Sequence, residues 1–375
     1  MRFTSWFVGV AVALGLSAVG QAQDDSMRIH FVDAGQANCA ILEFSKGVMV
    51  VDAGGEVAKP PGTFDGNEKV MTYLKKFFER RTDLAGRRFP IDLLAITHPH
   101  KDHTSAIPDV IDKYPPANVI HNHQRTGSGV DEQNIAVDYI RNSDARGYFI
   151  VQERAFESVR STGKGIHNDV IDPFTWPGTH PEVTVLSGGV RNNAGWGEVD
   201  FADENNHSLV IRVDFGGASV LFPGDIEEAD KKHGPPKKAT VERLVDAYAN
   251  TGVLDVDVYL VSHHASKNGG NDDLLRLISP EIAVISCGPP VAREGSKFSA
   301  FNFGHPRKQA LDEIEGAMAM TSLRAQPKDI KQFIEIKTPL DRQIKKAIYS
   351  TAWDGDIVLE AKASGDWTVK EPVGQ

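Results

Sequence analysis

Cysteine is almost absent from this chain, which has only Cys39 and Cys287 among its 375 residues. Two cysteines are too few for a disulfide framework or for a structural zinc site built from thiolates. Each lies in a short strand-like apolar run, so we expect two buried thiols that pack as small hydrophobic side chains. A disulfide between them is the alternative in an oxidising compartment.

Positive charge is also in deficit. The chain has 41 Lys and Arg residues against 51 Asp and Glu residues, a formal net charge of −10. Such a protein has no overall attraction for a phosphate backbone. Binding of nucleic acid would therefore depend on a local basic patch or on bound metal ions.

Long apolar runs are missing beyond the first residues, so we expect no membrane-spanning segment in the rest of the chain. The first residues differ, because Arg2 gives a positive start, 6–16 is almost wholly apolar, and Gly20-Gln21-Ala22 ends in small residues. This pattern predicts a signal peptide over 1–22 and a periplasmic or secreted protein with no stable membrane insertion after cleavage. An uncleaved anchor is the alternative.

The rest of the chain alternates short strands with helices. Apolar runs between Gly and Asp residues predict strands over 29–32, 40–44, 48–51 and 91–97, and helical spacing predicts helices over 68–80, 241–250 and 307–314. A terminal hairpin is expected around 357–359 and 367–369. We therefore predict one large layered α/β domain over 27–375. Residues 118–203, rich in Gly, Asn, His and Pro, are expected to form an elaborated loop region beside the site.

The strongest chemical signal is the segment Thr97-His98-Pro99-His100-Lys101-Asp102-His103, which follows a hydrophobic strand. Three imidazoles and a carboxylate supply the donors that Zn²⁺, and less selectively Mn²⁺ or Fe²⁺, prefers. A solvated His-rich loop is the alternative. It is disfavoured because so many titratable groups beside an apolar strand need a partner.

Two later strand ends add donors of the same kinds. Asp225 ends the run Leu221-Phe222-Pro223-Gly224, and His263 and His264 follow the strand predicted over 256–261. Alone, either position would more often hold a turn aspartate or a buried histidine. Together with the His98 loop they complete a set of donors for two metal ions.

The order of these motifs resembles the metallo-β-lactamase superfamily and, within it, the ComEC-like branch, the hydrolase domain of bacterial competence proteins. The resemblance spans nearly all of the chain after residue 27. The segments that carry it are Phe31-Val32-Asp33-Ala34-Gly35-Gln36, Val51-Asp52-Ala53-Gly54, His98 to His103, Asn205-Asn206-His207-Ser208, Gly224-Asp225, Ser262-His263-His264-Ala265-Ser266 and Phe303-Gly304-His305-Pro306.

The resemblance implies a four-layer αββα sandwich with two divalent metal ions, Zn²⁺ being preferred and Mn²⁺ or Fe²⁺ the alternatives. It implies that His98 and His100 bind the first ion, that Asp102, His103 and His263 bind the second, and that Asp225 bridges them. It also implies that Asp52 orients a ligand imidazole.

Two catalytic roles are expected beside the metals. Asp102 would orient the nucleophile, and His305 would bind or protonate the substrate. The branch's pattern is altered at Asn38, which stands in place of Asp, and at Ala265, which stands in place of Gly. His207 is a further candidate ligand, and His264 has either a packing role or a direct one.

The chemistry expected is hydrolysis by a metal-bound hydroxide, because two cations that share a water lower its pKa. The resemblance favours an exported phosphodiesterase or nuclease-like enzyme, whose substrate is a small molecule or another phosphoester, nucleic acid included. A lactone or β-lactam hydrolase is one alternative. An exported metal-binding or DNA-uptake accessory protein without catalysis is another, since fold alone does not decide function.

Overall fold

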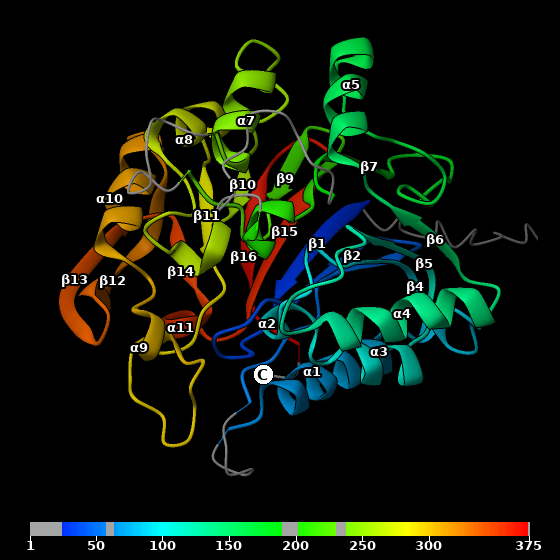
Figure 1. Ribbon diagram of the computed structural model, residues 1–375, viewed down its shortest axis with the longest axis horizontal. Coiled ribbons are helices and arrows are strands. Elements are labelled where there is room, and N and C mark those ends of the chain that lie inside the picture. The colour runs from blue at the N-terminus through cyan, green and yellow to red at the C-terminus, as the bar shows by residue number, and fades with distance from the viewer. Residues whose placement is uncertain (1–24, 58–63, 190–201, 230–237, 374–375) are drawn as a thin grey trace, which may run out of the picture.

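Two β-sheets face one another in the computed structural model, and helices cover the outer face of each (Figure 1). The structure describes residues 25–57, 64–189, 202–229 and 238–373. The order helix, sheet, sheet, helix confirms the layered αββα sandwich. The signal peptide predicted over 1–22 lies outside the described residues.

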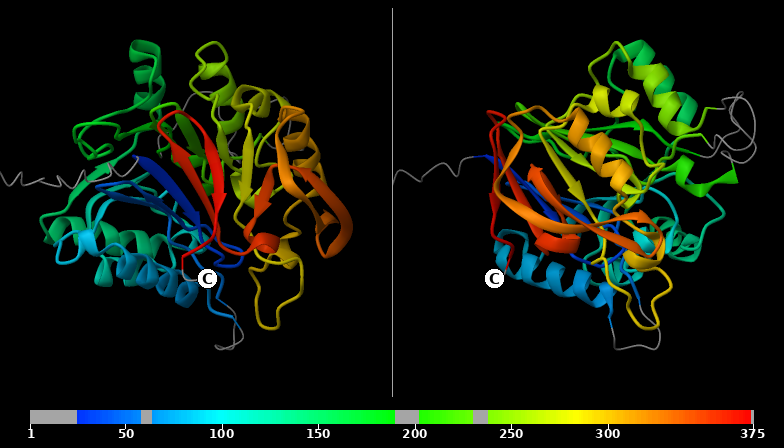
Figure 2. Two further views of the ribbon diagram at one scale, coloured as in Figure 1. Left: turned by 180° about the vertical axis from the view of Figure 1, so that it is seen from behind. Right: turned by 90° about the vertical axis from the view of Figure 1, so that its left-hand side faces the viewer.

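The first sheet runs in the order β16-β15-β1-β2-β3-β4-β5-β6. Neighbours from β16 to β3 are antiparallel, and those from β3 to β6 are parallel. The terminal hairpin belongs to this sheet, because β15 pairs with β1 (Figure 2). Its strands are β1 Ser26–Phe31, β2 Ala40–Glu43, β3 Val48–Val51, β4 Ile91–Ala95, β5 Pro116–His121, β6 Arg146–Phe149, β15 Ile357–Lys362 and β16 Trp367–Lys370.

The second sheet runs in the order β14-β11-β10-β9-β8-β7. Here β7, β8 and β9 are antiparallel, whereas β9, β10, β11 and β14 are parallel. Its strands are β7 Pro181–Ser187, β8 Val210–Phe215, β9 Ala218–Phe222, β10 Val258–Leu260, β11 Ile282–Ile285 and β14 Ile348–Ser350. A separate hairpin of β12 Leu323–Glu335 and β13 Thr338–Lys346, which the sequence analysis did not foresee, lies beside it.

Three buried apolar clusters hold these layers together. One lies between the sheets, one joins the first sheet to α1 and α3, and one joins the second sheet to α7, α8 and α10. The longer helices are α1 Gly66–Arg80, α3 Ile107–Lys113, α4 Val130–Asn142, α5 Gln152–Thr162, α7 Thr240–Tyr248, α8 Asp272–Ile278 and α10 Lys308–Ala317. The short ones are α2 Lys101–Thr104, α9 Ala300–Phe303 and α11 Thr351–Asp354.

Helix α1 shows how local sequence produces one of these layers. Asp65 caps it by accepting a hydrogen bond from the backbone N–H of Glu68 at 3.1 Å, which satisfies an otherwise unpaired donor. Val70, Leu74 and Phe77 are fully buried at helical spacing. Burial of that stripe against the first sheet is the main source of the helix's stability.

Residues 118–203 are more regular than the expected loop region. They include α4, β6, α5 and β7, while 190–201 lie outside the described residues. Helix α4 fully buries Gln133 and Ala136, and Ile140 packs partly buried against the cluster beneath the first sheet. Among the described residues, no helix has both the length and the apolar character needed to cross a membrane.

The parallel strands place the polar motifs at one edge of the sandwich. Asp52 directly follows β3, the His98 loop follows β4, Asp225 follows β9, and the segment from Ser262 follows β10. Parallel strands end at a common edge, which is where α/β proteins build their sites. Gly54 permits the closest approach, because a Cβ at this position would lie 1.7 Å from the carbonyl oxygen of Asp102.

Candidate metal centre

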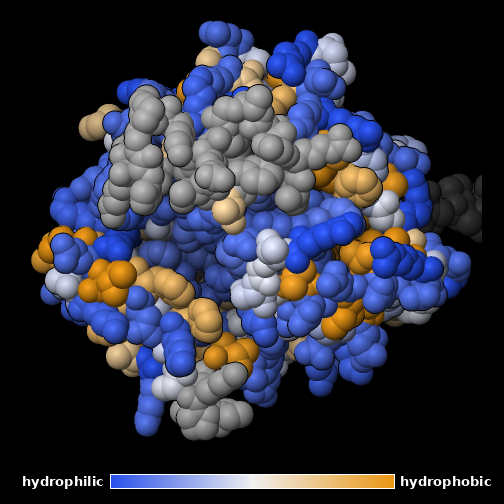
Figure 3. All heavy atoms as spheres, viewed as in Figure 1, coloured by the Kyte–Doolittle hydropathy of each residue, from blue (hydrophilic) through white to orange (hydrophobic). Residues whose placement is uncertain are grey.

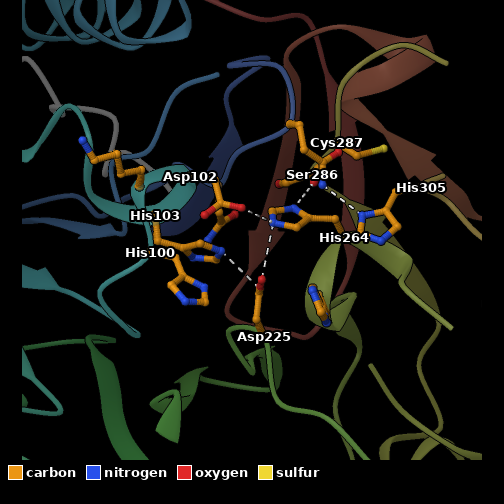
Figure 4. A network of polar contacts seen from close by, with 12 residues as sticks. His100, Asp102, His103, Asp225, His264, Ser286, Cys287 and His305 are labelled. Carbon is orange, nitrogen blue, oxygen red and sulfur yellow. Dashed lines mark hydrogen bonds and ion pairs between the residues drawn. The ribbon is translucent and has the colours of Figure 1, made fainter. Parts of the chain in front are cut away.

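Four side chains from three loops converge at this edge (Figure 4). Asp102 and His103 come from the loop after β4, Asp225 from the loop after β9, and His264 from the turn after β10. One ligand atom from each of the four lies within 4.8 Å of all the others. His103, Asp225 and His264 are buried, and Asp102 is half-buried.

Asp52 fixes the orientation of His103. Its carboxylate accepts a hydrogen bond from His103 Nδ1 at 2.7 Å and two more from the backbone N–H and the hydroxyl of Thr97, at 2.7 and 2.8 Å. Asn38, which replaces the aspartate of the ComEC-like pattern, also donates to Asp52, at 3.0 Å. With its proton on Nδ1, His103 turns the lone pair of Nε2 toward Asp225 Oδ1, 3.2 Å away. A carboxylate behind an imidazole is the usual support of a metal-binding histidine.

The backbone orients His264 in the same way. Its Nδ1 donates to the carbonyl oxygen of Ser286 at 2.6 Å, which leaves Nε2 facing Asp102 Oδ2 at 3.4 Å and Asp225 Oδ2 at 3.5 Å. Within the described residues, the Nε2 atoms of His103 and His264 are buried and have no hydrogen-bond partner. Buried polar atoms are rarely left unpaired, so two such lone pairs facing two carboxylates fit a divalent cation.

The charges of the cluster suit a cation as well. Burial alone would raise the pKa of Asp225, but His103 and His264 hold the pKa of this carboxyl well below its usual range. Burial would raise the pKa of Asp102 too, but the neighbouring imidazoles of His264 and His103 outweigh it and lower this pKa. Both carboxylates are therefore ionised at neutral pH, and they provide the hard oxygen donors of a mixed nitrogen and oxygen site.

His98 and His100 form a second pair of imidazoles beside the cluster. His98 Nε2 and His100 Nδ1 are 3.2 Å apart, and the rings of His98 and His103 are 4.2 Å apart. Burial and the neighbouring imidazoles of His103 and His100 hold the pKa of His98 well below its usual value. His98 is thus neutral, which is the form that binds metal.

His263 lies outside the four-residue cluster. Its Nδ1 is 3.0 Å from Glu227 Oε1, and His264 occupies the place where the sequence interpretation set His263. The backbone turn decides between them, because His263, His264 and Ala265 all have positive φ, of 50°, 53° and 61°. Non-glycine residues pay about 1–3 kcal/mol each for such conformations, which cluster at functional sites.

His305 stands behind the cluster. Gln36 Nε2 lies 3.0 Å from its Nδ1, and its ring centroid is 6.2 Å from that of His264 and 5.7 Å from that of His263. Burial and the two neighbouring imidazoles hold its pKa well below the usual value. Its expected contact with substrate stays a prediction.

His207 points elsewhere. Its Nδ1 lies 2.9 Å from the carbonyl oxygen of Gly189, and it is not part of the four-residue cluster. Sequence reasoning missed Glu227 and Glu204, whose carboxylates approach His263 at 3.0 Å and His100 at 3.9 Å. No motif marks either residue.

A cleft of about 710 Å³ opens over the cluster. Asp102, Asp225, His100 and His263 line its floor, and the apolar side chains of Val57, Phe298 and Phe303 also line it. The space-filling view shows the hollow with hydrophilic residues inside and hydrophobic residues along its lower left edge, over α9 (Figure 3). A ligand in this cleft would meet the ionised carboxylates directly.

The structure confirms the prediction that the two cysteines are buried thiols without a disulfide between them. Cys39 and Cys287 are both free and buried. Burial raises the pKa of Cys287 to about 12, so this thiol is protonated and unreactive at neutral pH.

Comparisons with known proteins agree on one family. The model of the metallo-beta-lactamase superfamily matches residues 32–288. ComE operon protein 3 of Bacillus subtilis is 29% identical over 89 residues, which are 24% of this chain and 10% of that protein. Competence protein ComA of Neisseria gonorrhoeae is 33% identical over 103 residues, 25% of this chain and 13% of that protein. The matched segments thus span about a tenth of these relatives.

Solved structures are more distant. The metallo-beta-lactamase fold protein YhfI from Bacillus subtilis is 10% identical with a TM-score of 0.38, and the alignment covers 86% of this chain and all of that one. Igni18, a metallo hydrolase from the archaeon Ignicoccus hospitalis, is 11% identical with a TM-score of 0.37, with 85% of this chain and 99% of that one covered.

Proposed function

Since this chain belongs to the metallo-β-lactamase superfamily and its curated relatives are ComEC-like competence proteins, we propose that it is a metal-dependent phosphodiesterase. The observation that carries the proposal is the buried cluster of Asp102, His103, Asp225 and His264, whose two unpaired imidazole nitrogens face two ionised carboxylates at the floor of a cleft.

The cluster would hold the catalytic cation, with His98 and His100 beside it for a second one. Zn²⁺ is the preferred ion, because the donors are imidazole and carboxylate. A cation bound there supplies Lewis acidity toward a phosphoryl oxygen and lowers the pKa of a water molecule. An ion at this position would pair the Nε2 atoms of both His103 and His264.

The chain's own residues prepare the reaction. Asp52 and the carbonyl oxygen of Ser286 fix the two imidazoles in the tautomer that presents Nε2. Asp102 lines the cleft with an ionised carboxylate, so it can orient an attacking water by accepting a hydrogen bond from it. Asp225 is buried, and its two oxygens face His103 and His264. It would therefore keep these two imidazoles at a fixed separation.

Phosphodiesters are preferred as substrates for two reasons. The curated relatives include proteins named for competence and recombination, and DNA is the phosphodiester handled in such processes. The cleft also presents ionised carboxylates, so an anionic substrate must be bound through the cation, which dominates the local charge. We further propose that the protein is exported, on the basis of the pattern in residues 1–22. Amino-terminal sequencing of the mature protein tests this, and an intact start at Met1 would contradict it.

Turnover assays with and without metal test the proposed activity. We expect chelated protein to lose hydrolysis of bis-p-nitrophenyl phosphate and to regain it with Zn²⁺ or Mn²⁺. His264→Ala and Asp225→Asn should abolish both turnover and metal loading, whereas His180→Ala, an exposed histidine on another surface, should change neither. Turnover of nitrocefin or a lactone without phosphodiesterase activity would identify an acyl hydrolase instead. No turnover by fully loaded protein would favour a non-catalytic accessory role.

A further inference from the structure

Two phenylalanines stand exposed in the same cleft as the metal centre. Phe298 is 57% exposed and Phe303 is 38% exposed, and both line the cleft together with Asp102 and Asp225. Their ring centroids are 6.2 Å apart, with the planes tilted by 39°. Large apolar side chains gathered at the mouth of a site commonly mark a ligand contact.

These rings continue an aromatic row that begins at the cluster. The ring of His264 lies 6.2 Å from that of His305 at an interplanar angle of 23°, and Phe303 lies 5.8 Å from His305 at the same angle. Phe298 extends the row toward solvent. One ligand could therefore stack a planar group on Phe298 and Phe303 and place a polar group beside Asp102 and Asp225.

The segment that carries the phenylalanines is fixed before any ligand arrives. The buried carboxylate of Glu56 accepts hydrogen bonds from Ser296 Oγ at 2.8 Å and from Arg293 at 2.9 Å. Asn302 Nδ2 donates to the carbonyl oxygen of Ser296 at 2.7 Å, and Ser299 caps α9. Phe298 therefore projects from a backbone anchored on both sides, which reduces the entropy lost on binding.

We propose that Phe298 and Phe303 form a stacking shelf for an unpaired base of a single-stranded oligonucleotide whose phosphodiester lies at the metal centre. This inference rests on the proposed function and names its substrate class. The net charge of −10 gives little help in binding a phosphate backbone, so stacking would add affinity to that supplied by the cation. Bases in a duplex are already stacked on one another, and the shelf therefore selects single strands.

Binding of matched probes to the metal-loaded protein tests the shelf. The probes are a labelled thymidine hexamer with phosphorothioate links, which resist cleavage, and an abasic hexamer with the same links and charge. We expect the thymidine hexamer to bind more tightly. Phe298→Ala and Phe303→Ala should each weaken it by about 5- to 150-fold, equivalent to about 1–3 kcal/mol, and leave abasic binding unchanged.

Controls separate this result from a general defect. Phe149→Ala removes a phenylalanine that is 50% exposed on β6, outside the cleft, and should leave both affinities unchanged. Melting temperature and zinc content, measured on every variant, show whether each one is folded and loaded. Base-dependent binding without any phosphodiesterase turnover would uphold the shelf while the proposed activity fails. Equal affinity for the two hexamers, or no binding of either to loaded protein, would overturn the shelf even if the enzyme is active.

Discussion

Asp52→Asn should weaken metal binding even though Asp52 is not one of the four residues that would hold the ion. The wild-type carboxylate accepts from His103 Nδ1 at 2.7 Å and from both donors of Thr97. An asparagine that keeps its oxygen toward the Thr97 backbone N–H turns its NH₂ group toward His103. That donor forces the imidazole proton from Nδ1 to Nε2, the nitrogen that faces Asp225.

The size of the effect follows from this change of tautomer. Loss of such an outer carboxylate costs about 10- to 100-fold in metal affinity, or about 1.4–2.7 kcal/mol. Competition titration against a zinc chelator measures the dissociation constant, and the melting temperature of the metal-free protein reports on folding. Asp92→Asn, a substitution on β4 away from the site, is the matched control. A folded Asp52→Asn variant with wild-type zinc affinity would refute the orienting role.

Other substitutions test the rest of the structure. His264→Ala should abolish zinc loading while His263→Ala retains it, because His264 Nε2 faces Asp102 and Asp225 whereas His263 Nδ1 faces Glu227; equal metal content by atomic emission would contradict this. Glu43→Gln should destabilise the fold by about 2 kcal/mol, since it removes the carboxylate that accepts from the part-exposed Arg80 and the buried Arg81. Those partners hold the pKa of Glu43 below its ordinary value of 4.5, so its stabilisation is complete above about pH 4.5 and is lost as the pH falls further. Urea unfolding of both proteins at pH 7 and pH 3 checks this, and an equal difference at both would refute it. Cys39 and Cys287 should resist a thiol reagent in the native protein and react after unfolding, whereas rapid native labelling would show that they are accessible.

The sequence predicted the elements whose pattern is strong. The helix expected over 68–80 is α1, Gly66–Arg80, and the strand expected over 91–97 is β4, Ile91–Ala95. Both have an unbroken apolar stripe or run, so burial and local propensity agree. Helix α4 was not predicted because its inner face mixes the amide of Gln133 with Ala136 and the partly buried Ile140, so its apolar stripe is short.

The site was predictable as a set of loops but not atom by atom. Chain order shows that the His98 loop and Asp225 follow strands, and parallel strands bring such ends together. The choice between His263 and His264 depends on three consecutive positive φ angles, which no composition or spacing reveals. His263, which lies in that turn, has its Nδ1 3.0 Å from Glu227 Oε1. The aromatic row likewise depends on how α9 is anchored, and single exposed phenylalanines carry no signal in sequence.

The cation site itself can be tested by anomalous diffraction from a crystal of the zinc-loaded protein, recorded at the zinc absorption edge. The structure predicts a peak within bonding distance of His103 Nε2, His264 Nε2 and a carboxylate oxygen of Asp225. A loaded crystal whose zinc peaks all lie away from these three side chains would contradict the central claim.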